Sequence, residues 1–406
     1  MTVTVYSSTD TSAPTLNNLK GSLVALLDAV LVNGYGTQSA AGWSIAYTAS
    51  SGRVYRQGTG NQYYLRVDDT YPGSASQPGY ALVNGLTTTT GYAYGVNAQN
   101  IWPSNQSSQI TMPTVAIVSS TITPTNQFVI AGDFTDALPA GRPFVVAGTV
   151  SNNGTYTVST STYSSPNTTI TTTTAVTATA GAVGTIAIYS GIPGMIWQRT
   201  YNVTANVAWT IIATSKAFYL WINMDNGSAP YLASQLYFFG DITSFRTSDA
   251  FATLLCGSMA TNTVTAAACP MVTITNSIAT AIPGHYMAKS FTQIGTAINV
   301  GKHSDNIRNS SGFFGRGSLT YPNLMDGRAT LAPIWIHEPN IGAGAIRGYM
   351  PGIWNPCHLT PFAHGDTFSG ASSGLLAGKT FMVFNMANTT TALSQGQCAI
   401  ETSNTW

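Results

Sequence analysis

Charged side chains are scarce in this chain of 406 residues, where they make up 7% of the sequence against roughly 25% in an average soluble protein. The chain contains only two glutamates, Glu338 and Glu401. Long helices that face water usually carry glutamate and lysine on their outer side, so we expect little helix. The formal net charge is +1 and no run of like charges occurs, which argues against a nucleic-acid-binding surface.

The polar surface must instead be built from Thr, Ser, Asn, Gln and Gly, which favour strands and turns. A surface that is nearly neutral does little to keep separate copies apart in solution. One interpretation is an unusual composition with no further meaning. The interpretation we favour is that much of this surface is buried against other subunits.

Long apolar runs are also missing, since no run reaches the roughly 18 residues of a membrane-spanning helix. The first residues, MTVTVYSSTD, have neither the basic nor the apolar segment of a signal peptide. We therefore expect a protein made in the cytoplasm without a classical export signal. The length suits two to three domains.

Cysteine is rare and unpaired in sequence. No Cys-x-x-Cys pair occurs among Cys256, Cys269, Cys357 and Cys398, which argues against a zinc or thioredoxin-type motif. A hairpin could join Cys256 to Cys269, but buried thiols are the state we favour. The thiol state of all four is left open.

What the chain does have is a strand–turn–strand rhythm, clearest from Val115 to Tyr189. Nearly every second residue there is β-branched, aromatic or Ala, and the breaks are Pro, Gly and Asn, including the hairpin signal Asn152-Asn153-Gly154. The rhythm predicts six strands, at 115–123, 128–134, 143–150, 154–163, 168–176 and 183–189. Such a segment suits a small sandwich or barrel.

This segment divides the chain into three parts: a β-rich domain at 1–113, an inserted all-β module at 114–190 and a β-rich domain at 191–406. An insertion needs its two ends close together, so we expect deletion of the module to leave the flanking parts folded. The fold class predicted for the whole chain is mainly β, with β-sandwich or meander domains and one N-terminal helix.

The single clear helix is predicted at 16–33. Apolar side chains recur there at helical spacing, at Leu23, Leu26, Leu27, Val30 and Leu31. Gly34 and Gly36 supply a C-terminal stop. The helix covers a sheet in the interpretation we favour, and the alternative is a helix at an oligomer interface.

Further strands are predicted outside the module, at 43–47, 53–57, 62–67, 80–83, 262–278, 288–300, 331–337, 346–350, 380–385 and 398–402. A short helix is expected after Asp249, and a long polar loop at 301–327. The segment 43–85 also resembles 209–242, because each has a tryptophan-led strand and then an aromatic-Tyr-Leu strand. We interpret this as a degenerate internal duplication, the alternative being chance similarity between two β-meanders.

Candidate sites for chemistry are few. His358, His364 and Asp366 lie within nine residues and could hold a metal ion, or could equally bond the backbone of a Pro/Gly-rich loop. No recognisable motif accompanies the aspartates at 68, 69, 225, 241 and 249, so paired carboxylates for glycoside hydrolysis are not indicated. We expect no catalytic residues, no cofactor and no enzyme.

Aromatic residues make up 11% of the chain. Cross-strand packing accounts for most of them, while exposed aromatic rings in loops would suit binding of sugars.

Several stretches carry a resemblance to a known group of proteins, in chain order TVYSSTDTSAPTL, GSLVALLDAVLVNGYG, AAGWSIAY, VYRQGTGNQYYLRVDD, LYFFGDI, DAFAT, IRGYMPGIWNPCH, AHGDTFSG, GLLAGKTF and the final ETSNTW. Together they resemble virion-associated structural proteins of tailed bacteriophages, many of them uncharacterised or minor virion proteins. The module, with VVAGTVSNNGTYTVSTST, resembles small β-domains inserted in phage tail and neck components. The resemblance implies no catalytic residues.

Two functions follow as expectations. The first is a structural subunit of the tail, baseplate, neck or capsid surface, a homo-oligomer that assembles with other virion proteins. The second is a receptor- or glycan-binding adhesin of a tail tip or head fibre, whose contact is the module or the loop at 301–327. A tailspike depolymerase is a distant third, because no β-helix repeat is visible. Neither a nucleic acid nor a membrane is an expected partner.

Overall fold

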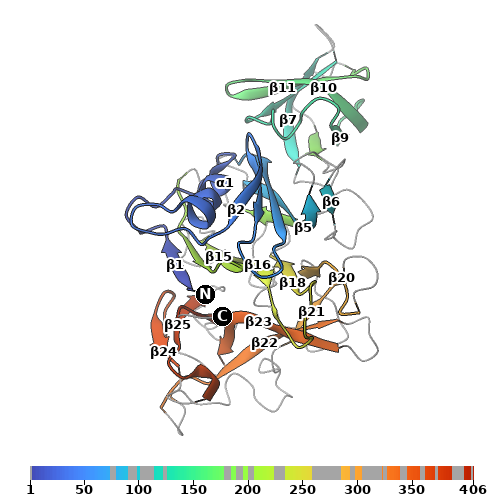
Figure 1. Cartoon of the computed structure of the whole chain (residues 1–406). Coiled ribbons are helices and arrows are strands. Elements are labelled where there is room, and N and C mark those ends of the chain that lie inside the picture. The colour runs from blue at the N-terminus through green and yellow to red at the C-terminus, as the bar shows by residue number, and fades with distance from the viewer. Residues whose placement is uncertain are drawn as a thin grey trace.

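Antiparallel sheets form nearly all of the regular structure in the computed structural model of the chain (Figure 1). The structure describes residues 2–73, 79–89, 98–100, 114–121, 126–177, 184–188, 195–199, 205–223, 234–257, 285–292, 298–303, 322, 327–338, 345–356, 362–370, 374–385, 397–403 and 406. The strand predicted at 262–278 and most of the loop predicted at 301–327 lie outside these residues. The mainly β fold with one N-terminal helix, predicted from composition and alternation, is confirmed.

The first sheet is a meander of strands from the N-terminal part of the chain, joined by one strand from after the module. Its order is β13-β5-β4-β3-β2, with β6 paired to β5. The strands are β2 (Ser44–Ala49), β3 (Gly52–Arg56), β4 (Tyr64–Tyr71), β5 (Tyr80–Thr89), β6 (Ala98–Asn100) and β13 (Met195–Gln198). The strands predicted at 43–47, 53–57, 62–67 and 80–83 are therefore present.

The helix is shorter than the predicted 16–33. It comprises α1 (Ser22–Leu27), which continues as the π-helix η1 (Asp28–Asn33). Residues 16–21 were predicted to be helical from their sequence but are not. Leu16 forms a β-bridge with Val207, and Gly21 has φ 81°. The predicted stop is confirmed at Gly34, whose φ is 78°.

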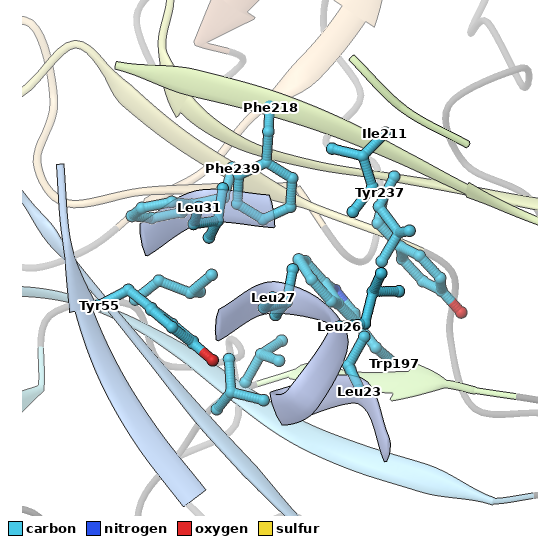
Figure 2. Packing of buried hydrophobic residues seen from close by; sticks show 14 of the residues in the cluster. Leu23, Leu26, Leu27, Leu31, Tyr55, Trp197, Ile211, Phe218, Tyr237 and Phe239 are labelled. Carbon is cyan, nitrogen blue, oxygen red and sulfur yellow. The ribbon is translucent and has the colours of Figure 1, made fainter. Parts of the chain in front are cut away.

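The apolar face of the helix is buried between two sheets. Figure 2 shows Leu23, Leu26, Leu27 and Leu31 between Tyr55 of the first sheet and rings of the second sheet. The same core contains Trp43, whose indole N–H donates to the carbonyl oxygen of Thr214 at 2.8 Å. The helix therefore covers a sheet within this chain, as the favoured interpretation of the sequence predicted.

The second sheet is central and is buried on both faces. Its order is β1-β14-β15-β16-β18-β19-β20. Phe218 and Leu220 of β15 face the helix core, while Tyr219 and Trp221 face the third sheet. Every residue of β15 and β16 is therefore buried. The strands are β1 (Thr4–Ser7), β14 (Trp209–Ala213), β15 (Ala217–Ile222), β16 (Gln235–Asp241), β18 (Thr253–Cys256), β19 (His285–Met287) and β20 (Ile298–Asn299).

The third sheet packs on the outer side of the second and has the order β21-β22-β23-β26-β25-β24, with β17 paired to β23. Cys256 and Cys398 are buried in the core between the two sheets, as favoured for the thiols, while Cys269 and Cys357 lie outside the described residues. The strands are β17 (Thr243–Ser244), β21 (Gly301–His303), β22 (Leu331–Glu338), β23 (Ala345–Pro356), β24 (Thr367–Ser369), β25 (Thr380–Asn385) and β26 (Gln397–Glu401), and a 3-10 helix spans Gly374–Leu376.

Two local predictions in this half of the chain are wrong. The residues after Asp249 form a turn and not a short helix, because the Asp249 carboxylate accepts the N–H of Phe251 at 3.2 Å and so closes an Asx-type turn. The strand predicted at 288–300 is reduced to β20 in the described residues, since 288–292 form bends and a turn.

The predicted module is a closed six-stranded barrel of order β10-β11-β8-β7-β12-β9. Phe128, Phe144 and Tyr156 fill its interior, with ring centroids 5.0–5.9 Å apart. Its strands are β7 (Val115–Thr121), β8 (Gln127–Ala131), β9 (Pro143–Ala147), β10 (Gly154–Ser164), β11 (Asn167–Thr172) and β12 (Thr185–Ile188). The first and last of these are neighbours, with Ala116 opposite Thr185, so the ends of the module lie side by side.

Strand pairs cross the boundary predicted between 1–113 and 191–406. β1 pairs with β14, and β13 pairs with β5. The two flanking parts therefore share sheets. The proposed duplication stays a prediction: β14 pairs directly with β15, whereas β3 separates the equivalent strands β2 and β4.

Candidate functional site

Two of the three residues predicted as metal ligands, His364 and Asp366, are used in packing and turn formation. The ring of His364 stacks on Trp221 at 4.0 Å and meets Phe384 edge-on at 5.4 Å. Burial lowers the pKa of His364 from 6.5 to about 4. Asp366 is exposed and accepts the N–H of Ala363 at 2.7 Å, and His358 lies outside the described residues. No group of three His, Cys, Asp or Glu side chains suited to a metal occurs in the described part of the chain.

A different cluster centres on Arg347, which the sequence alone did not single out. The register of β22 and β23 shifts so that Ile336 pairs with Gly348 but His337 pairs with Ile346. Arg347 is therefore the extra residue of a β-bulge, a feature that re-aims a side chain. Its side chain has no exposed surface.

Two carboxylates bind this guanidinium. Asp249 accepts from Nε and from Nη2, both at 2.8 Å. Glu338 accepts from Nη1 at 2.8 Å, and the carbonyl oxygen of Lys289 accepts from the same nitrogen at 2.5 Å. The bidentate pair with Asp249 is the geometry that planar guanidinium groups favour.

Each of the two carboxylates also accepts a hydrogen bond from a serine hydroxyl. Ser244 donates to Asp249 at 2.8 Å, and Ser290 donates to Glu338 at 2.7 Å. Burial alone would raise the pKa of Asp249, but the hydrogen bonds and charge of Arg347 hold it below its usual value. Asp249 is thus an anion at neutral pH.

The Arg347 cluster fixes the two aromatic walls of an open cavity of about 430 Å³. One wall is Phe245, whose backbone N–H donates to the carbonyl oxygen of Arg347 at 2.8 Å. The other is Phe291, whose N–H donates to Glu338 at 2.8 Å. Arg246, Ala345, Ile346 and Arg347 itself complete the lining.

An aromatic ridge continues from this cavity across the third sheet. Trp335 of β22 and Tyr349 of β23 are register partners, with ring centroids 5.9 Å apart. Phe245 contacts both, at 5.7 and 6.0 Å. Phe245 is 58% exposed and Ile346 is 48% exposed, so apolar side chains face solvent here beside a preformed hollow.

A second polar cluster holds the barrel on the body. Lys20 forms ion pairs with Asp133 at 2.9 Å and with Asp136 at 3.1 Å. Tyr71 meets Phe134 edge-on at 5.0 Å, and Tyr71, Tyr80 and Leu82 of the first sheet belong to the barrel's core cluster. The barrel is therefore seated on the outer face of the first sheet.

Beneath this seat lies a buried ion pair between Asp69 and Arg199, at 2.7 Å. Asp69 accepts the N–H of Leu23 at 2.8 Å and so caps α1, while Arg199 donates to the carbonyl oxygen of Tyr71 at 2.5 Å. Burial raises the pKa of Asp69 to about 7, against the opposing charge of Arg199. The ion pair joins α1, β4 and the end of β13 at the place where the barrel contacts the first sheet.

No helix among the described residues is long and apolar enough to cross a membrane.

No family model and no curated protein sequence matches the chain. Among solved structures, the chain is similar to one titled "Phage phi92 endosialidase", at 8% sequence identity and a TM-score of 0.18. That alignment covers 100% of this chain and 69% of the other. A TM-score of this size does not establish a shared fold.

Proposed function

We propose that the chain is a structural subunit of a bacteriophage virion, a component of the tail, baseplate, neck or capsid surface that acts through protein–protein assembly. The observation that supports this most is the closed barrel inserted at one end of the stacked sheets (Figure 1). β5 and β13, which flank the insertion, are paired with each other. A body that carries a separate module in this way suits a subunit that assembles through the body and displays the module.

The composition supports the same proposal. Charged residues are only 7% of the chain, and many of them form ion pairs inside it, including Arg66 with Asp68 and Lys379 with Glu401. Little charge is left to keep neighbouring copies apart. Contacts with copies of itself and with other virion proteins would cover such a surface, and the site of action would be the virion, assembled in the host cytoplasm.

Immunogold labelling of purified phage particles with antibodies against the chain tests the proposal. The expected result is labelling confined to one region of the particle, together with a ring-forming oligomer when the purified chain is examined by light scattering. Particles that carry no label even after mild disruption, together with a chain that remains monomeric, would contradict it.

A second candidate function is that of an adhesin which binds a receptor or glycan. The specific observation in its favour is the exposed ring of Phe245 beside the open cavity. An adhesin function of this kind requires no catalytic step and no cofactor. It places the contact on the third sheet, whereas the sequence pointed to the module or to the loop at 301–327.

A further inference from the structure

We infer that the cavity between Phe245 and Phe291 is a binding site for an oligosaccharide that carries a carboxylate. The inference rests on the second candidate function, and it names the site and the chemistry of the ligand. It is independent of where in a particle the chain resides.

The first support is that the walls of the cavity are fixed before any ligand arrives. The backbone N–H groups of Phe245 and Phe291 are both bonded to the Arg347 cluster, one to the Arg347 carbonyl and one to the Glu338 carboxylate. The Arg347 side chain is fully buried and makes hydrogen bonds to three acceptor groups. Burying such a cluster costs desolvation energy, and the cluster anchors the backbone of both aromatic residues that line the cavity.

The second support is the shape of the apolar surface. From Phe245 the rings of Trp335 and Tyr349 follow at centroid separations of 5.7 and 5.9 Å. An oligosaccharide presents successive flat C–H faces with polar edges, and aromatic side chains pack on such faces. The cavity volume of about 430 Å³ lies in the range of roughly 300–1,000 Å³ typical of small-molecule sites.

The third support is charge. Arg246 lines the cavity and is exposed, and among the described residues no acceptor engages its guanidinium, whereas Asp249 and Glu338 are already bound to Arg347. A planar guanidinium at the rim favours a carboxylate, which it can bind through two hydrogen bonds.

A second copy of the chain is a poorer occupant. It has only 14 acidic residues in 406, and several of those in the described part are paired within the chain. It therefore offers little to complement Arg246. An acidic ligand from outside the chain fits the charge better.

Isothermal titration calorimetry with the purified full-length chain tests the inference, using oligogalacturonides as the acidic probe and maltooligosaccharides of equal length as the neutral one. We expect the acidic probe to bind in the micromolar to millimolar range and the neutral one to bind at least about tenfold more weakly. Equal binding of the two, or binding of neither, would overturn the inference. Equal binding of polyglutamate would also overturn it, in favour of an acidic peptide.

Three variants locate the site. Arg246→Gln should weaken oligogalacturonide binding by about tenfold, which corresponds to about 1.4 kcal/mol, and Phe245→Ala should weaken it by at least as much. Tyr163→Ala is the matched control, because Tyr163 is an exposed aromatic on the barrel, at 42%. Loss of binding in the control, with binding intact in the first two variants, would place the contact on the barrel and refute the assignment.

Both test residues are exposed, so we expect the variants to keep the thermal unfolding midpoint of the wild type. These outcomes do not depend on the particle-labelling experiment. A chain that is present in virions but binds no sugar would refute only the inference. A chain that binds the acidic sugar but is absent from virions would refute only the structural proposal.

Discussion

Replacement of Arg347 by methionine should destabilise the protein more than any exposed substitution. The arginine side chain is fully buried, and its carboxylate partners, Asp249 and Glu338, are 1% and 3% exposed. The variant leaves two buried anions without their cation. Removing one partner of a buried ion pair costs about 3–5 kcal/mol. Hydrogen bonds from Ser244 to Asp249 and from Ser290 to Glu338 remain, so we expect a loss of unfolding free energy within that range and not twice it.

The loss should depend on pH in a defined direction. In the wild type Arg347 holds the pKa of Asp249 below its usual value of 3.8, so the carboxylate's contribution to folding is complete above that pH and is lost as the pH falls through the lowered pKa. In the variant, burial acts without Arg347 and raises the carboxyl pKa. Protonation of Asp249 then removes the cost of its buried charge. The difference in unfolding free energy between wild type and variant should therefore become smaller as the pH falls from about 8 to about 5.

Urea unfolding monitored by tryptophan fluorescence measures both effects. Arg246→Met is the matched control, since Arg246 is adjacent to the same cavity but exposed, and it should change the unfolding free energy by less than about 0.5 kcal/mol. A variant at Arg347 within about 1 kcal/mol of the wild type would show that the buried cluster does not stabilise the fold. A loss that is the same at every pH would show that the orphaned carboxylates do not take up protons in this range.

Three further predictions concern other regions. Because the pKa of His364 is about 4 in the folded protein and 6.5 ordinarily, the wild type should lose at most about 3 kcal/mol as the pH falls between these values, less for a partly exposed ring. His364→Phe keeps the stack on Trp221 and should flatten that slope in acid unfolding; an unchanged slope would contradict it. Arg199→Met should cost about 3–5 kcal/mol in urea unfolding at about pH 9 by leaving the Asp69 carboxylate buried without its cation, and less near neutral pH, where burial favours the protonated acid; a cost below about 1 kcal/mol at about pH 9 would show that the ion pair between Asp69 and Arg199 does not stabilise the fold. Replacing 115–188 by a short Gly/Ser linker should leave β-sheet circular dichroism and cooperative unfolding, because β5 and β13 still pair; an unfolded product would show that the barrel is integral.

The strands were largely predictable because they depend on local pattern. Alternation and turn residues predicted all six barrel strands within a few residues of their bounds. The start of the helix was not predictable, since it depends on a β-bridge between Leu16 and Val207, which are distant in sequence. The burial of β15 on both faces could not be predicted for a similar reason, because a continuous apolar run does not show what packs on each face.

The Arg347 cluster was beyond sequence reasoning for the same physical reason. Asp249 lies 98 residues from Arg347 in the chain, and the bulge that aims the arginine arises only from the pairing of β22 with β23. One signal was available. In a chain with only two glutamates, Glu338 directly follows the strand predicted at 331–337, and a lone carboxylate in such apolar surroundings needs a buried partner.

We propose that this chain assembles into a virion through its stacked sheets and displays its barrel. A symmetry-averaged density map of the purified particle would show whether the copies assemble in this way. We expect repeated copies in contact through the three-sheet body, with the barrel of each copy projecting away from those contacts. A particle that contains no density for the chain, or one in which the barrels alone form the contacts between copies, would contradict it.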